Sequence, residues 1–124
     1  MKSGTRTKLV QKIYEKTNNP DGEIDLGKDP YIRHIKKVFK GYFEQEAELD
    51  ALLEKNLSPD LKLRNLDSLL RIILKTSIYE LKFCTKIPFK VVIDQYLDVT
   101  DTFYGNDQKR LVNGVLDSVA KTLE

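Results

Sequence analysis

The sequence of 124 residues contains one cysteine, one histidine and no tryptophan. Cys84 has no partner for an internal disulfide, which fits a reducing compartment. With His34 as the single histidine, the chain lacks the side chains for a zinc-type cluster or a Cys/His nucleophile. Its isolated glycines form no phosphate-binding loop, and no apolar run reaches the roughly 20 residues of a membrane span. We therefore expect a protein that is not an enzyme and has no cofactor, metal or membrane span.

The first residues, MKSGTRTKLVQ, lack the apolar centre of a signal peptide, so we expect a cytoplasmic protein. The net charge of +2 conceals an alternation along the chain. Segments 1–16, 31–42 and 61–90 are net positive, and segments 18–30, 43–60 and 91–124 are net negative. Such segments either neutralise one another in the fold or leave a basic patch for a polyanion.

Apolar residues recur at three- and four-residue spacing along nearly the whole chain, whereas strand-like alternation is almost absent. The longest apolar segment, Leu66–Phe83, is apolar around most of its circumference, as expected for the central helix of a domain. The pattern predicts an all-α fold, a single domain over residues 1–124 with six to seven helices. The expected helices cover residues 5–16, 30–43, 44–57, 66–83, 88–104 and 107–124.

Short polar motifs predict where several of these helices begin. Asp29–Pro30 and Ser58–Pro59 each place a capping residue before a proline, which favours the first turn of a helix. Asp107 is expected to cap the last helix.

Two features inside the helices need a special environment. Glu80 projects from the apolar side of the central helix, and a buried carboxylate must find hydrogen bonds or a cation. We expect Glu80 to tie that helix to a neighbouring helix end or to an arginine or lysine. Asn113–Gly114 interrupts the last helix with two poor helix formers, on the side away from the apolar stripe. We expect Gly114 to lie at a close contact with another helix or a ligand.

Three segments in order, ILKTSIYEL at 73–81, IPFKVVIDQYLDV at 87–99 and RLVNGVLD at 110–117, resemble the NusB family of bacterial transcription antitermination factors. QKIY at 11–14, Gly41 and Leu49–Asp50 also sit where that family repeats similar residues. The resemblance implies two packed helical subdomains without catalysis. It also implies binding of the boxA element of ribosomal RNA leader transcripts together with a small-subunit ribosomal protein, NusE. That complex would join elongating RNA polymerase.

Single strands are bound by cations at phosphates and by exposed aromatic rings, and helix N-termini suit phosphates or base edges. On this basis the predicted RNA-binding residues lie at the start of the first helix, one to two turns further on, and at the start of the last helix. They are Lys2, Arg6, Lys8, Tyr14, Asp107, Lys109 and Arg110. Arg6 shares a helical line with Leu9 and Ile13, and we expect it to emerge at a rim of the fold.

The chain departs from the family pattern at positions that concern RNA. The arginine-rich N-terminus is thinned to Lys2, Arg6 and Lys8, and Leu111 stands where an aromatic residue usually precedes Val-Asn-Gly. A second hypothesis is therefore a non-enzymatic protein-interaction module with weakened or lost RNA binding. The retained Asp107, Arg110 and Tyr14 favour RNA binding, although Tyr14 could equally pack at the edge of the core and Lys109 and Arg110 could be plain surface charges.

Overall fold

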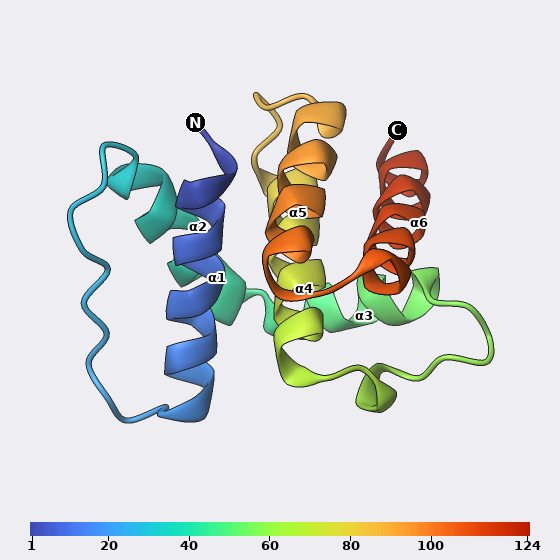
Figure 1. Ribbon diagram of the computed structural model, residues 1–124, viewed down its shortest axis with the longest axis horizontal. Helices are drawn as coiled ribbons and strands as arrows, with labels where there is room; N and C mark the ends of the chain where they lie inside the picture. The colour runs from blue at the N-terminus through green and yellow to red at the C-terminus, as the bar shows by residue number, and fades with distance from the viewer.

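A computed structural model describes all residues, 1–124, as an all-helical domain without strands. The chain forms six α-helices and one short 3₁₀ helix, and Figure 1 shows their arrangement. Their bounds are α1 Ser3–Asn18, α2 Ile32–Glu44, α3 Glu46–Asn56, η1 Leu63–Asn65, α4 Ser68–Phe83, α5 Phe89–Phe103 and α6 Asn106–Leu123. The all-α prediction is confirmed. None of these helices is both long and apolar enough to cross a bilayer.

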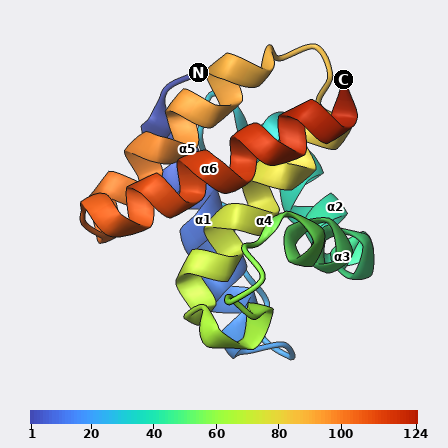
Figure 2. The ribbon, with the colours of Figure 1, turned by 90° about the vertical axis from the view of Figure 1, so that its right-hand side faces the viewer.

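The central helix is α4, as its all-round apolar sequence predicts. It contacts each of the other α-helices, and most of its residues are buried. In Figure 1, α1 and α2 lie on one side of α4 and α5, with α6 on the other. Figure 2 looks onto α6, which crosses in front of α4 and α5 and packs against both. The starts of α1 and α5 lie at one end of the molecule, and the α5–α6 turn lies toward the other.

The helix starts differ in part from the sequence prediction. Asp67 caps α4 by accepting a hydrogen bond from the Leu70 backbone N–H at 2.8 Å, so the helix begins at Ser68. Asp29 accepts from the Tyr31 N–H at 2.8 Å, and α2 begins after this turn rather than at the proline. No α-helix follows Ser58–Pro59; the prediction there was wrong, because the chain continues as a loop with only the short η1.

Charges on α3 and α4 neutralise one another, which answers part of the question raised by the alternating segments. Lys75 of α4 is buried and lies 3.1 Å from Glu46 and 3.0 Å from Asp50 of α3. Lys82 of α4 pairs with Glu48 in the same way. Part of the negative charge of segment 43–60 is therefore neutralised by ion pairs within the fold.

Candidate nucleic-acid interface

A buried ion pair fixes α1 against the central helix. Arg6 donates hydrogen bonds from Nε to Glu80 Oε2 at 2.9 Å and from Nη2 to Glu80 Oε1 at 2.7 Å. The two side chains are 1% and 0% exposed, so the bidentate pair is withdrawn from water. Glu80 thus obtains the buried cation that its apolar position requires. The expectation that Arg6 emerges at a rim of the fold was wrong, because its guanidinium points inward to this carboxylate.

Two further side chains complete the coordination of Glu80. The Tyr96 hydroxyl of α5 donates to Oε2, and His34 Nε2 of α2 lies 2.8 Å from Oε1. An ionised carboxylate only accepts, so the imidazole donates here. Burial works to raise the pKa of Glu80, but the hydrogen bonds from His34 and Arg6 and the arginine charge outweigh it, and the pKa is lowered. Four helices therefore meet at one ionised carboxylate.

The group His34, Glu80 and Cys84 brings potential metal-ligand atoms within 4.8 Å of one another. The chemistry of Glu80 argues against its use as a ligand. Its four lone-pair sites are matched by four donors, two of them on the Arg6 guanidinium. Burial also raises the pKa of the Cys84 thiol, which disfavours the thiolate that a metal would need. We read this cluster as a structural centre.

The remaining predicted cations of α1 are on the surface. Lys2 is exposed, precedes the first turn of the helix and has no ion-pair partner. Lys8 is exposed as well, and its Nζ lies 3.1 Å from Asp29 Oδ2, at the turn before α2. A backbone hydrogen bond from Tyr31 and the Lys8 ammonium lower the pKa of Asp29. The start of α1 therefore offers one free cation and one in an exposed ion pair.

Tyr14 lies further along α1 with its side chain 40% exposed, one of three large hydrophobic residues that remain open to solvent. Tyr104, after α5, donates from its hydroxyl to Asp67 Oδ1 at 2.6 Å. Burial and Asp67 raise the pKa of Tyr104, and Tyr14 acts in the same direction, which places the two phenols near each other. Tyr14 of α1 and Tyr104 at the α5–α6 turn therefore lie in the same region of the surface.

The start of α6 carries the other predicted residues, all engaged in surface ion pairs. Lys109 Nζ lies 2.7 Å from Asp101 Oδ2 of α5, and this hydrogen bond raises the lysine pKa. Arg110 pairs with Asp107 one turn earlier, and both side chains are largely exposed. Asp107 lies within the first turn, because α6 begins at Asn106 with Gly105 at its N-cap; the predicted cap was wrong. Exposed pairs of this kind are worth about 0–1 kcal/mol, so a phosphate can compete for either cation.

Asn113 and Gly114 are exposed on the outer face of α6. A Cβ added at Gly114 would meet no atom within 4 Å, so the predicted close contact is absent from this chain. Gly114 and Leu111 instead line an open hollow of about 470 Å³ between α6 and the end of α3. Ser118 and Asn56 also line this hollow, and the Ser118 hydroxyl donates to Asn56 Oδ1 at 2.6 Å.

The predicted residues therefore separate into two clusters. Lys2 and Lys8 belong to the first half of α1, whereas Tyr14 belongs to its second half, and α6 starts on the other side of α4 and α5 from α1 (Figure 1). Lys2, just before α1, and Tyr14 are twelve positions apart, about 18 Å at 1.5 Å per helical residue. A ligand that touches Lys2 and Tyr14 together must span this distance, as an extended chain does.

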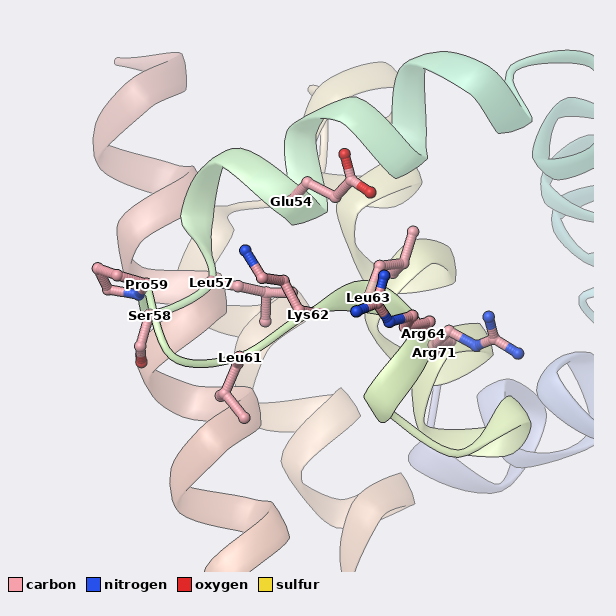
Figure 3. A pocket seen from close by; sticks show the side chains of 9 residues that line it. All are labelled: Glu54, Leu57, Ser58, Pro59, Leu61, Lys62, Leu63, Arg64 and Arg71. Carbon is pink, nitrogen blue, oxygen red and sulfur yellow. The ribbon is translucent and has the colours of Figure 1, made fainter.

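A third basic site was missed by the sequence reasoning. Figure 3 shows a pocket of about 490 Å³ between the end of α3, the connection after it and the start of α4. Lys62, Arg64 and Arg71 line it and have no ion-pair partner, while Glu54 lies across from them. The only signal in the sequence was the positive charge of segment 61–90.

Comparisons with known proteins agree on one family. The model of the NusB family matches residues 4–121. The transcription antitermination protein NusB of Bartonella tribocorum is 38% identical over 117 residues, which cover 94% of this chain and 74% of that protein. Its counterpart from Bartonella quintana is 34% identical over the same shares of the two chains. A solved structure of T. maritima NusB aligns with a TM-score of 0.84 over 98% of this chain and 93% of the other, at 23% identity, which concerns the fold alone. The chain therefore belongs to the NusB family of transcription antitermination proteins.

Proposed function

We propose that this protein is a transcription antitermination factor without catalytic activity that binds boxA RNA of ribosomal RNA leader transcripts together with the ribosomal protein NusE. The complex would then act on elongating RNA polymerase. The family match over residues 4–121 carries the proposal. The exposed Tyr14, near the α5–α6 turn and its surface cations, supplies chemistry suited to a single strand.

The two clusters suggest how an extended RNA would be held. Tyr14 offers a ring on which a base can stack, a contact worth about 1–3 kcal/mol. Lys109 and Arg110 can exchange their surface carboxylates for phosphates, which also relieves the unfavourable placement of cations at a helix N-terminus. Lys2 and Lys8 would take phosphates further along the strand. Arg6 has no part in these contacts, because its buried guanidinium is committed to Glu80.

The proposal is tested by fluorescence anisotropy with labelled boxA RNA and a scrambled RNA of the same composition, with and without NusE. We expect the parent protein to prefer boxA and to bind it more tightly when NusE is present. Tyr14→Ala should weaken binding about 5- to 150-fold, the equivalent of the stacking energy. Lys121→Ala removes an exposed lysine without an ion pair at the far end of α6 and should change little.

Two results would count against this function. Equal affinity for boxA and scrambled RNA, with and without NusE, would contradict specific recognition. Loss of RNA binding with retained NusE binding would instead favour the protein-interaction hypothesis, for which Leu111 in place of an aromatic residue is the motivating feature.

A further inference from the structure

The outer side of α2 carries a row of cations that no predicted site uses. At 3.6 residues per turn its members fall within an arc of about 100°, opposite the buried face of the helix. All are exposed and none takes part in an ion pair. This row, termed the α2 cationic face, consists of Arg33, Lys36, Lys37 and Lys40.

No carboxylate forms an ion pair with the α2 cationic face. Asp29 is already paired with Lys8, and the next acidic residue, Glu44, ends α2 on the same side one turn after Lys40 without pairing with it. The acidic helix α3 is partly occupied by the lysines of α4, as shown above. Segment 31–42 therefore carries four unpaired cations, in addition to the unpaired Lys62, Arg64 and Arg71 of segment 61–90.

A second element extends this positive surface. Lys86, in the connection between α4 and α5, is exposed and also unpaired. Lys86 and Lys37 line the same hollow of about 320 Å³, and Lys37 Nζ reaches to 3.5 Å from the Phe83 carbonyl oxygen beside it. The α2 cationic face therefore continues onto the connection that follows the central helix.

The burial of α2 limits the class of partner. A basic amphipathic helix on a membrane needs its apolar side free to enter the lipid. Here Ile35, Val38 and Tyr42 are 1%, 0% and 1% exposed, so the apolar side of α2 is buried in the core and cannot enter a lipid layer. Tyr31, at the N-cap of α2, is 45% exposed and offers a ring for base stacking. A cationic row beside an exposed aromatic fits single-stranded nucleic acid better than an acidic peptide.

We propose that the α2 cationic face, extended by Lys86, binds phosphate groups of single-stranded RNA outside the boxA segment, without regard to base sequence. This inference rests on the proposed function, because the transcript brings the flanking RNA to the protein. The row from Arg33 to Lys40 is about 10 Å long. The α2 cationic face binds a short stretch of the RNA phosphate backbone through charge alone.

The test compares two labelled RNAs, boxA alone and boxA extended by a tail of roughly ten uridines on either end, a length within known single-strand sites. The parent should bind the extended RNA more tightly and with a steeper salt dependence. Lys36→Gln/Lys40→Gln should lose this gain and keep its affinity for boxA alone. Each phosphate contact on a single strand contributes about −0.7 to the slope of log K against log salt, so two lost contacts change it by about 1.4. The ratio of the parent's association constant for the extended RNA to that of the variant should then fall about sevenfold between roughly 50 and 200 mM salt.

Controls separate charge from other effects. Lys36→Arg/Lys40→Arg keeps both charges and should behave as the parent, and Lys121→Gln removes an unrelated exposed lysine. Equal affinities and salt slopes of parent and Lys36→Gln/Lys40→Gln on the extended RNA would overturn the proposal. The proposal would also be overturned if the parent bound polyglutamate more tightly than oligouridine at matched salt, and if Lys36→Gln/Lys40→Gln weakened that polyglutamate binding. Failure of the proposed function looks different: the parent would then not prefer boxA to scrambled RNA, while oligouridine binding would still respond to the α2 substitutions.

Discussion

Replacing Arg6 by alanine should destabilise the fold strongly, because it leaves a buried carboxylate without its cation. Removal of one partner of a buried ion pair typically costs about 3–5 kcal/mol. Glu80 keeps the hydrogen bonds from Tyr96 and His34, so we expect the lower part of this range. Domains of this kind have a total stability of about 5–15 kcal/mol, and most of the variant should still fold. With a urea m-value of about 1.5 kcal/mol/M, the midpoint should fall by about 2 M.

The pH dependence gives a sharper test than the magnitude. In the parent, Glu80 has a pKa below its ordinary value of 4.5, because donors to the carboxylate outweigh burial. Its contribution to stability is therefore complete above that ordinary pKa and is lost as the pH falls through the lower, folded pKa. Without Arg6, burial dominates and the pKa of Glu80 should rise above the ordinary value. The variant is then stabilised by protonation and loses this stability as the pH rises through its raised pKa.

The difference in free energy of unfolding between parent and Arg6→Ala should therefore be largest near neutral pH and shrink as the pH falls toward about 4.5. Urea unfolding followed by far-ultraviolet circular dichroism at several pH values measures it. Arg110→Ala is the matched control, since its exposed ion pair should contribute less than about 1 kcal/mol. Combining Arg6→Met with Glu80→Gln should recover part of the loss. A loss below about 1 kcal/mol for Arg6→Ala, independent of pH, would refute the reasoning.

Two glycines should respond to alanine in opposite directions, and urea unfolding distinguishes them. Gly114→Ala adds a methyl group where no atom lies within 4 Å and should stabilise α6 by up to about 1 kcal/mol; destabilisation would show a contact that the structure lacks. Gly41→Ala places its methyl group on the phenol ring of Tyr79, which is almost fully buried, and should cost about 1–3 kcal/mol. An unchanged midpoint for Gly41→Ala would mean that the ring moves aside freely.

The helices and their central member follow from the sequence because burial imposes a period of 3.6 residues on each. The segment Leu66–Phe83 is apolar on most sides, and α4 contacts every other α-helix. Helix starts depend on single capping contacts and were less predictable. Ser58–Pro59 has the composition of a helix start, but no regular apolar stripe follows it, and the largely exposed segment that follows forms only the short η1.

The misplacement of Arg6 has a different cause. Its helical line with Leu9 and Ile13 was visible in the sequence, yet its partner is 74 positions away. Periodicity reports which side of a helix is buried, but it does not report which helix covers that side. Two opposite charges on apolar faces, Arg6 and Glu80, were the available signal, and pairing them needs the tertiary contact between α1 and α4.

Gly114 was misread because a glycine inside a helix has two explanations. A close contact requires a small residue, whereas an exposed site only tolerates one at a cost of about 1 kcal/mol. In this structure Gly114 is at an exposed site, because no atom lies within 4 Å of a Cβ added there. The hollow beside Gly114 is open, so a contact at this position would have to come from a partner rather than from within the fold.

The distribution of unpaired cations decides which surface should govern the attraction of RNA. At the start of α1, the burial of Arg6 and the ion pair of Lys8 leave Lys2 as the only free cation. At the start of α6, both cations are paired on the surface. The pocket after α3 has three free charges, on Lys62, Arg64 and Arg71, and the α2 cationic face has four. If long-range attraction scales with uncompensated charge, the salt dependence of RNA binding should depend more on α2 than on α1 or α6. Base recognition would then lie near Tyr14, and the affinity for flanking RNA would come from α2.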